Sequence, residues 1–445
     1  MHDLIIIGGG PAGYHAAELA AKEGLKAVLF EERSLGGVCL NEGCIPSKTL
    51  LNSAKIYDQA QNGGAYGVSV EKASLDHRLV IQRKDNVVST LVGGVKAAMS
   101  ASNVKVIKGH AHIADNTRVE ANGETYNGRR LIIATGSAPV IPPIDGIAEG
   151  IKNGFILTSR EILDLQEAPG RLAIIGGGVV GLEMASYYNS VGSDVTVIEM
   201  LPAIGGAIDP DISSILLKSH KKKGIDFKLG KRVTAVTNGA VIYDGGRTEA
   251  DKVLLSIGRR PVVDGFGLEN TSVLVEHGAI KTDRHGLTSI PNIYAVGDVN
   301  GRYMLAHAAY REAEVAVNHI LGKKDIMRYG AMPSVIYTSP EVACVGETEE
   351  TAKGKGIDPE TATVPMVYSG RYLAENAVTD GICKLVIDKQ HRNIIGVHMI
   401  GSYASEIILS ACTMIEMQMR VDDVKEIIFP HPTVSEIIRE AVFRF

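Results

Sequence analysis

The sequence lacks a long apolar run and an excess of basic residues. No apolar stretch approaches the ~20 residues of a membrane span, so we expect no transmembrane helix and no membrane partner. The formal net charge of −5 argues against nucleic acid as the main partner. An apolar strand begins by Leu4, which leaves no room for a signal peptide, so the expected location is cytoplasmic.

Cysteine is also scarce, with five residues in 445. Their spacing fits neither a metal-ligand set nor a dense disulfide framework, so no metal is expected. Cys39 and Cys44 lie five positions apart. A regular helix would separate them by about 7.5 Å along its axis, whereas a disulfide needs Cα atoms within roughly 4.4–6.8 Å. A bridge therefore requires a break in the helix, and we expect Asn41 and Gly43 to supply it through positive φ angles.

Pro46 suits the first turn of a helix that runs through Leu50 and Tyr57. The dipole of that helix favours a thiolate at Cys44, near its N-terminus. A disulfide that closes so short a loop gains only about 2 kcal/mol from chain entropy, so it is suited to opening and closing. The alternative is two unpaired, buried thiols, which the neighbouring motifs make less attractive.

The chain contains an internal repeat. Residues 4–31 align without a gap with residues 172–199, at an offset of 168 positions. Each copy reads as an apolar strand, a glycine-rich turn, a helix and a second strand that ends in an acid. The aligned residues are Gly8 with Gly176, Gly10 with Gly178, Gly13 with Gly181, and Glu31 with Glu199.

Such units bind dinucleotides. The first glycine makes the turn, the second lets the backbone approach the pyrophosphate, and the third lets the helix pack on the strand. The helix N-terminus attracts the phosphates, and the acid accepts hydrogen bonds from ribose. Two copies predict two dinucleotides. Glu199 would repel the 2′-phosphate of NADP and is followed by Met200 rather than arginine, so the second site is expected to prefer NAD.

Three later apolar segments read as strands that end in small-residue turns, although each could be an ordinary buried strand: residues 131–136, 253–258 and 293–298. No glycine fingerprint follows residue 330, and strands at 335–337 and 381–387 with helices at 404–419 and 434–442 indicate an α+β domain. We predict an α/β fold with two Rossmann-like domains and a C-terminal α+β domain.

A His-Pro-Thr turn precedes the last helix. Thr433 followed by Glu436 is typical of a capping box, so Glu436 could serve only as a cap and His431 could be a loop residue. The functional alternative is that Glu436 orients His431 as a base, because only a thiolate attacks a disulfide.

These motifs together resemble the pyridine-nucleotide disulfide oxidoreductases, and within them the enzymes that oxidise dihydrolipoyl groups. The resemblance covers essentially the whole chain. It rests on GGVCLNEGCIPSK, two GxGxxG units, ATGS, IGRRP, NIYAVGD, MLAH, YTSPEVACVG and HPTVSE, in the family's order.

The resemblance implies FAD on the first turn, NAD on the second, and a C-terminal dimerisation domain of a homodimer. It implies four segments: residues 1–142 and 265–328 for FAD, 143–264 for NAD, and 329–445 for the interface. The implied FAD residues are Gly8, Gly10, Gly13, Glu31, Gly37, Lys48, Ala111, Thr135, Gly136, Ser137, Asp298, Met304, Leu305, Ala306 and His307. The implied NAD residues are Gly176, Gly178, Val179, Gly181, Glu183, Glu199 and Gly258.

The resemblance also implies catalytic roles. Cys39 would be the thiol that meets the substrate, and Cys44 the thiol next to the flavin. Lys48 would lie near the flavin and pair with Glu183, a residue that could otherwise be a plain helix glutamate. His431, paired with Glu436, would be the base that serves the other subunit.

The expected activity is oxidation of protein-bound dihydrolipoyl groups with NAD. The expected partner is a lipoyl-bearing protein of a 2-oxo acid dehydrogenase, glycine cleavage or acetoin complex. Departures from the family pattern at Phe429, Glu42 and Ala138 affect the substrate channel and the dithiol. Two alternatives stay open: an NAD(P)H-dependent reductase of another disulfide, such as glutathione disulfide, and an electron-carrier subunit without dithiol activity.

Overall fold

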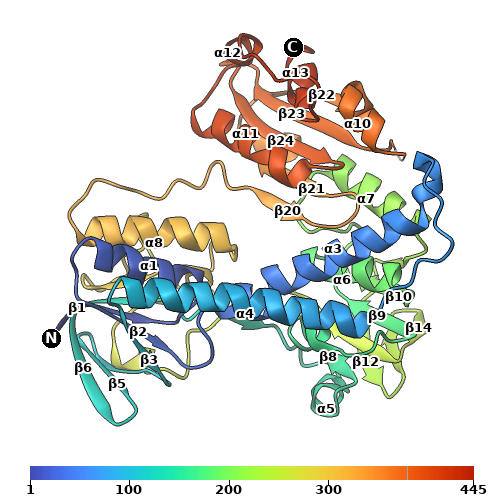
Figure 1. The fold of residues 1–445 in the computed structure, drawn as a ribbon. Helices are drawn as coiled ribbons and strands as arrows, with labels where there is room; N and C mark the ends of the chain where they lie inside the picture. Colours follow the sequence, from blue (N-terminus) through green and yellow to red (C-terminus); the bar gives the residue numbers. More distant parts are fainter. Residues whose placement is uncertain (378) are drawn as a thin grey trace. The chain divides into compact units, whose positions relative to one another are not determined.

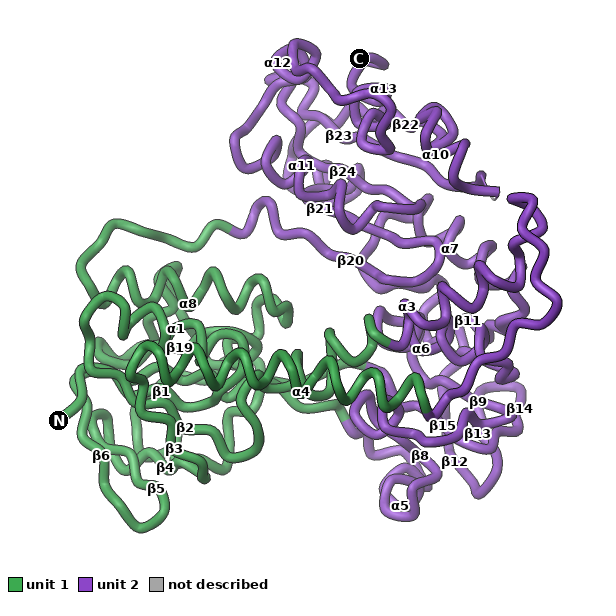
Figure 2. The backbone as a smooth tube through the Cα atoms, viewed as in Figure 1, with its two compact units in different colours: residues 1–49, 79–140, 258–328 green, residues 50–78, 141–257, 329–445 purple. Residues whose placement is uncertain are grey.

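The computed structural model describes residues 1–377 and 379–445, which form two compact units (Figure 2). Unit 1 comprises residues 1–49, 79–140 and 258–328, and unit 2 comprises residues 50–78, 141–257 and 329–445. Each unit contains one copy of the internal repeat and gathers segments that are far apart in the sequence.

Unit 1 is built on a seven-stranded sheet with the order β3-β2-β1-β6-β5-β4, in which β19 also pairs with β6. The strands of this sheet are β1 (His2–Ile7), β2 (Ala27–Glu31), β3 (Lys105–Lys108), β4 (His112–Asp115), β5 (Arg118–Ala121), β6 (Glu124–Ile133) and β19 (Ile293–Ala295). Unit 1 also contains two two-stranded sheets, formed by β7 (Ser137–Pro139) with β16 (Arg259–Pro261) and by β17 (Val275–Glu276) with β18 (Ala279–Ile280). Its helices are α1 (Pro11–Lys22), α2 (Gly37–Glu42) and α8 (Ala306–Ile320), with the first part of α3 (Cys44–Gln61) and most of α4 (His77–Ala101).

The centre of the sheet in unit 1 is parallel and buried on both faces. Leu4 and Ile6 of β1 pack in one cluster with small alanines of α1, whereas Ile5 and Ile7 pack in the cluster on the other face. The alanines Ala16 and Ala17 of α1 are fully buried, so this helix packs closely on the sheet. Helices α1 and α8 lie side by side on that face (Figure 1). The predicted strand–turn–helix–strand unit is confirmed.

Unit 2 holds the second copy of the repeat in a five-stranded sheet with the order β11-β10-β9-β15-β8. The elements of this part are β8 (Ile156–Leu157), β9 (Arg171–Ile175), β10 (Asp194–Glu199), β11 (Asp226–Leu229), β12 (Val233–Thr237), β13 (Ala240–Tyr243), β14 (Gly246–Glu249), β15 (Lys252–Leu255), α5 (Ile147–Lys152), α6 (Val179–Ser190) and α7 (Pro210–Lys222). The strands of the sheet run parallel, as the repeat predicts.

The C-terminal part of unit 2 has a different architecture, an antiparallel sheet with the order β20-β21-β24-β23-β22, which we call the interface sheet. Its elements are β20 (Ser334–Ile336), β21 (Val342–Gly346), β22 (Pro359–Pro365), β23 (Ile382–Asp388), β24 (Ile394–Ile400), α9 (Glu349–Gly354), α10 (Gly370–Glu375), α11 (Ala404–Glu416), α12 (Val421–Lys425) and α13 (Glu436–Val442). The predicted α+β character is confirmed, and both predicted helices are present with shorter bounds.

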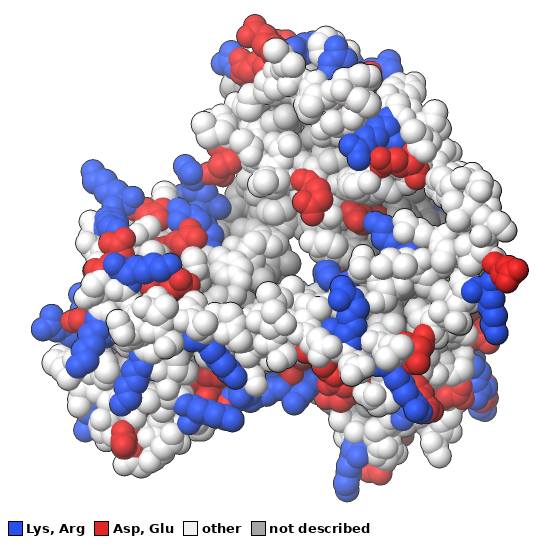
Figure 3. Space-filling model, viewed as in Figure 1, with Lys and Arg blue, Asp and Glu red and all other residues white. Residues whose placement is uncertain are grey.

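Charged side chains of both signs are interspersed on the face shown in Figure 3. This mixture agrees with the modest net charge of −5. Within the described residues, no helix combines the length and the hydropathy needed to cross a membrane.

Replacing His220 with leucine is expected to stabilise the fold. His220 of α7 is 0% exposed, and neither ring nitrogen contacts a hydrogen-bonding group in the described part of the chain. A buried, unsatisfied polar group costs about 1–3 kcal/mol, so H220L should raise the melting temperature near neutral pH.

The same substitution carries a pH signature. Burial, followed by the charge of Lys223, lowers the pKa of His220 to about 3. The folded protein therefore holds this ring neutral, while the unfolded chain protonates it below the ordinary histidine pKa of 6.5. The parent should therefore lose stability, relative to H220L, by about 1.4 kcal/mol for each pH unit below that value. Melting curves at pH 7.5 and pH 5.0 test this. A variant that melts no higher than the parent at either pH would contradict the prediction.

Candidate active site

The two glycine-rich turns have matching geometry. In the first, Glu31 at the end of β2 accepts the N–H of Gly9 on Oε2 at 2.7 Å. In the second, Glu199 at the end of β10 accepts the N–H of Gly177 on Oε2 at 2.6 Å. The acids that the sequence assigned to ribose binding therefore lie directly beside their turns in both copies.

Packing within the chain does not require glycine at the middle position of either fingerprint. Gly10 and Gly178 precede the helices α1 and α6, with φ values of −74° and −79° that any residue can adopt. A Cβ atom at Gly178 would meet no described atom within 4 Å, and one at Gly10 would approach only Gly37 Cα, at 3.8 Å. No side chain caps either helix by a hydrogen bond in the described structure. Space beside exposed helix N–H groups fits a pyrophosphate, so both turns fit a dinucleotide.

The third glycine of each fingerprint is required by packing. A Cβ atom at Gly13 would lie 1.7 Å from the carbonyl oxygen of Gly8, and one at Gly181 would lie 2.1 Å from that of Gly176. We expect G13A to be isolated without flavin, because the first turn must open to admit the methyl group. G181A should keep its flavin and bind NADH at least about tenfold more weakly, a change of about 1.4 kcal/mol.

Absorbance spectra and NADH titrations of the purified variants test this pair of substitutions. Gly93 in the middle of α4 is the matched control, because a Cβ atom there meets no described atom within 4 Å. G93A should behave as the parent. A G13A protein with a full complement of flavin would contradict the role given to this turn.

A cavity of about 440 Å³ lies beside the first ribose acid. Glu31 and the loop residues Arg33 and Leu35 line one side, and Lys96 and Met99 of α4 line another. Its lining combines apolar side chains with a few charged ones, as is usual for small-molecule sites.

The other residues that the sequence assigned to the first site are distributed over the same unit. Ala111 follows β3 and is buried, and Gly37 begins α2. Thr135 donates its hydroxyl to the carbonyl of Val262 at 2.7 Å. Four residues mark the start of α8 or directly precede it: Met304, Leu305, Ala306 and His307.

Ser137, Asp298 and Arg259 form a polar cluster in unit 1. Ser137 donates its hydroxyl to Oδ2 of Asp298 at 2.5 Å. Arg259 donates to Ser137 Oγ at 2.7 Å and to its carbonyl at 2.6 Å. Burial lowers the pKa of Arg259, while the charges of Asp298, Glu42 and Cys44 oppose that shift. The cluster thus brings a guanidinium within electrostatic range of the dithiol.

The two cysteines lie on either side of a helix break. Cys39 belongs to α2, Cys44 is the first residue of α3, and Gly43 between them has φ −148° and ψ −111°. The predicted departure from a regular helix is confirmed, but the predicted positive φ angles at Asn41 and Gly43 are wrong. Gly43 breaks the helix at negative φ, where a Cβ atom would lie 2.9 Å from the carbonyl oxygen of Val38.

No disulfide joins the two cysteines, and their side chains contact each other through a hydrogen bond. That bond, together with burial, raises the pKa of Cys39, and the charge of Lys48 opposes the rise. Cys44 lies at the N-terminus of α3, where the helix dipole favours negative charge on its sulfur.

Sequence reasoning did not find two tyrosines that lie near this dithiol. The hydroxyls of Tyr14 in α1 and Tyr310 in α8 are hydrogen-bonded to each other. Burial is the main reason that the pKa of each phenol is raised, and the charges of Cys39 and Cys44 add to the rise. Arg259 was also missed, although it belongs to the quoted motif IGRRP. No local signal in the sequence marks the two tyrosines.

His431 and Glu436 form a pair, with Nδ1 of the ring 2.8 Å from Oε1 of the carboxylate. The other oxygen accepts the N–H of Thr433 at 2.8 Å. The predicted capping box is only half present: the hydroxyl of Thr433 donates to the carbonyl of Pro430 instead, and the residue that precedes α13 is Ser435. Glu436 therefore caps the turn and orients the imidazole at the same time, and the ring is 77% exposed.

In the second site, Val179 begins α6 and Gly258 follows β15 with φ +120°. Glu183 is buried in α6 and accepts the N–H of Tyr337 on Oε1 at 3.0 Å. Its expected pairing with Lys48 stays a prediction. The described residues contain no group of three or more His, Cys, Asp or Glu side chains placed to hold a metal ion.

Comparison with known proteins agrees with this geometry. Residues 2–313 match the family described as pyridine nucleotide-disulphide oxidoreductase, and residues 332–442 match its dimerisation domain. The dihydrolipoyl dehydrogenase of Mycoplasma pneumoniae is 39% identical, with 99% of this chain and 97% of that protein covered. The dihydrolipoyl dehydrogenase of Chlamydia muridarum is 38% identical, with 99% and 96% covered.

Solved structures lead to the same family. LpdA from Mycobacterium tuberculosis has a TM-score of 0.91 at 26% identity, with 100% of this chain and 99% of that chain covered. The HOCl-induced flavoprotein disulfide reductase RclA from Escherichia coli has a TM-score of 0.89 at 28% identity, with 99% of each chain covered. With matches over nearly its full length, this chain belongs to the pyridine nucleotide-disulphide oxidoreductase family.

Proposed function

We propose that this protein is a dihydrolipoyl dehydrogenase that oxidises protein-bound dihydrolipoyl groups with NAD. The observation that carries the proposal is the Cys39–Cys44 dithiol, placed at the N-terminus of α3 in the unit that contains the first dinucleotide turn. The name shared by relatives at 38–39% identity supports the choice of substrate.

The residues would act in the following order. His431 takes a proton from one substrate thiol, and the resulting thiolate attacks Sγ of Cys39. The Cys39–Cys44 bond breaks and leaves a thiolate on Cys44. The second substrate thiol then gives up its proton and attacks the first substrate sulfur, so that the bond to Cys39 breaks and the substrate leaves as a disulfide. Cys39 takes up the proton that the second thiol released, and His431 keeps the first proton. The product is a reduced pair, and in the structure the side chains of Cys39 and Cys44 are hydrogen-bonded to each other.

FAD, bound on the first glycine-rich turn, supplies the two-electron carrier between this dithiol and NAD. Glu31 would hold its ribose, and Asp298 with Ser137 and the start of α8 would line the flavin. Lys48 favours negative charge on the dithiol through its own charge. NAD would bind at the second turn, with its ribose on Glu199.

We also propose the assembly. The dimerisation domain supports a homodimer, in which His431 of one subunit would serve the dithiol of the other. The lipoyl-bearing protein of a 2-oxo acid dehydrogenase, glycine cleavage or acetoin complex would be the substrate partner. The division into residues 1–142, 143–264, 265–328 and 329–445 stays a proposal, as does the cytoplasmic location.

Steady-state assays of NAD and NADP against dihydrolipoamide and glutathione test the function. We expect turnover with dihydrolipoamide and at least a tenfold preference for NAD, because Glu199 repels a 2′-phosphate by about 1–4 kcal/mol. Turnover of glutathione with NADP would favour the disulfide-reductase alternative. A protein that binds FAD and turns over neither dithiol would favour the electron-carrier alternative.

A further inference from the structure

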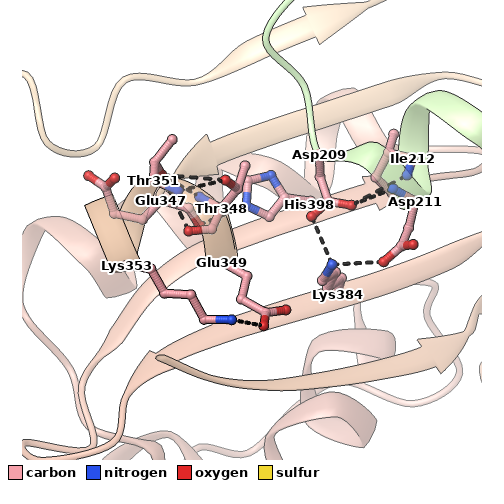
Figure 4. A network of polar contacts seen from close by, with 10 residues as sticks. All are labelled: Asp209, Asp211, Ile212, Glu347, Thr348, Glu349, Thr351, Lys353, Lys384 and His398. Carbon is pink, nitrogen blue, oxygen red and sulfur yellow. Dashed lines mark hydrogen bonds and ion pairs between the residues drawn. The ribbon is translucent and has the colours of Figure 1, made fainter. Parts of the chain in front are cut away.

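A buried ion-pair network joins the interface sheet to the start of α7 (Figure 4). The ammonium of Lys384 in β23 lies 2.9 Å from Oδ2 of Asp209 and 2.7 Å from Oδ2 of Asp211. The side chains of Lys384 and Asp209 are 7% and 0% exposed. Fully buried charges are rare in proteins and require an explanation.

Asp209 also caps the helix. Its Oδ1 accepts the backbone N–H groups of Asp211 at 2.9 Å and Ile212 at 3.4 Å. Burial alone would lower the pKa of Lys384, but its hydrogen bonds with Asp211 and Asp209 outweigh burial and raise the pKa, so the lysine stays charged. Lys384 therefore holds the residue at which the chain enters α7.

The lysine projects from a well-fixed part of the interface sheet. Strand β23 pairs with β22 on one side and β24 on the other, and Lys384 lies opposite His398 of β24. Nε2 of His398 lies 2.9 Å from the carbonyl oxygen of Glu347, to which it donates. Burial lowers the pKa of His398, so this ring is neutral and adds no charge beside the ammonium.

The loop of residues 200–208 connects the end of β10 to Asp209 and passes beside the second glycine-rich turn. It begins directly after Glu199, the acid assigned to ribose. Within it, Gly205 donates its N–H to the carbonyl of Gly177 at 2.8 Å. The loop thus runs from the ribose acid, past the glycine turn, to the residue that Lys384 holds.

Two further contacts fix this loop. Ser213 of α7 donates its hydroxyl to the carbonyl of Ile204 at 2.8 Å. Ile336 of β20 lies near the loop, since a Cβ atom built on Gly205 would be 3.6 Å from its Cδ1. The loop is therefore bonded to α7 through Ile204 and to the glycine turn through Gly205, so a shift of α7 would reach the glycine turn.

We propose that Lys384 is a positioning residue for the dinucleotide of the second turn. By fixing Asp209 and α7, it holds the loop of residues 200–208 so that Gly177 and Glu199 keep the geometry that binds the adenosine ribose. A buried ion pair adds little net stability compared with apolar residues of the same volume, so placement rather than stability accounts for its presence. This inference rests on the proposed NAD site.

The test measures binding rather than turnover. In the full-length, flavin-loaded protein, K384M should raise the Kd of NADH and of ADP-ribose by at least about tenfold. ADP-ribose lacks the nicotinamide ring and therefore reports on the adenosine side alone. Flavin content should stay equal to that of the parent, and K384R should restore both affinities to within about threefold.

K353M is the matched control, because Lys353 pairs with Glu349 at 2.6 Å on the surface of the same region (Figure 4). It should bind both ligands as the parent does. K384M leaves Asp209 buried without its lysine, so the double variant D209N/K384M decides the matter if the single variant folds poorly. The double variant should show the same tenfold loss.

The positioning role would be overturned if K384M and D209N/K384M both bound the ligands with a Kd within twofold of the parent. If K384M does not fold, the same result in the double variant alone would overturn it. The variant E199Q separates this outcome from failure of the NAD site itself. If E199Q weakens ADP-ribose binding while the Lys384 variants do not, only the positioning role is wrong. If E199Q also binds normally, the assignment of ribose to Glu199 is wrong and the positioning role fails with it.

Discussion

Replacing Cys44 with serine is expected to lower dihydrolipoamide turnover by at least about a thousandfold, as removal of an essential member of a catalytic unit does. Serine cannot form the disulfide that accepts electrons from the substrate, although it fits the first position of α3. The first dinucleotide turn is untouched, so C44S should keep its flavin and continue to oxidise NADH with artificial electron acceptors. Steady-state assays with both kinds of acceptor measure the two effects.

Cys412 provides the matched control. It is a partly buried free thiol in α11. Because C412S leaves the Cys39–Cys44 pair intact, it should retain turnover within about twofold of the parent, well inside the thousandfold loss expected for a catalytic thiol. Unimpaired dihydrolipoamide turnover in C44S, or an equal loss in C412S, would contradict the assignment of the redox couple.

Replacing His431 with glutamine is expected to lower dihydrolipoamide turnover by about 10²–10⁴-fold, the usual contribution of a general base. Because only a thiolate attacks a disulfide, the exchange between the substrate thiols and the Cys39–Cys44 pair needs a group that moves protons. NADH oxidation by artificial acceptors should be unchanged, since it does not use the dithiol. Kinetics with dihydrolipoamide and with an artificial acceptor separate these effects.

His391 offers a close control for His431. Its Nδ1 lies 2.6 Å from Oδ2 of Asp388, so it is also an exposed histidine paired with a carboxylate in the C-terminal domain. H391Q should retain full turnover. If H391Q and H431Q lost activity equally, the effect would belong to the fold of the domain, and the role of His431 as a base would be refuted.

Much of the fold could be predicted because its determinants are local and repeated. The gapless alignment of residues 4–31 with 172–199 places strand, turn, helix and acid in each copy, and the structure confirms these elements. The hydrogen bonds from Gly9 to Glu31 and from Gly177 to Glu199 follow from that pattern. Each depends on residues only 22 positions apart.

The rest depends on contacts between distant segments. Tyr14 and Tyr310 meet although 296 positions separate them, and Arg259 reaches Ser137 over 122 positions. Such meetings are decided by packing of the whole domain rather than by propensity. The helix break at Gly43 was expected, but not its negative φ, because glycine is compatible with both signs of φ and the sequence does not choose between them.

Differential alkylation is the most direct test of the central claim that Cys39 and Cys44 exchange electrons with substrate and NAD. Samples of the anaerobic, flavin-loaded protein would be taken at three points: before reduction, after one equivalent of dihydrolipoamide, and after the subsequent addition of excess NAD. Each sample would be denatured, labelled with iodoacetamide and analysed by mass spectrometry. We predict that Cys39 and Cys44 are protected at first, labelled after dihydrolipoamide, and protected again after NAD, while Cys344, Cys383 and Cys412 are labelled throughout. Labelling of Cys39 and Cys44 that does not change between the three conditions would contradict the account.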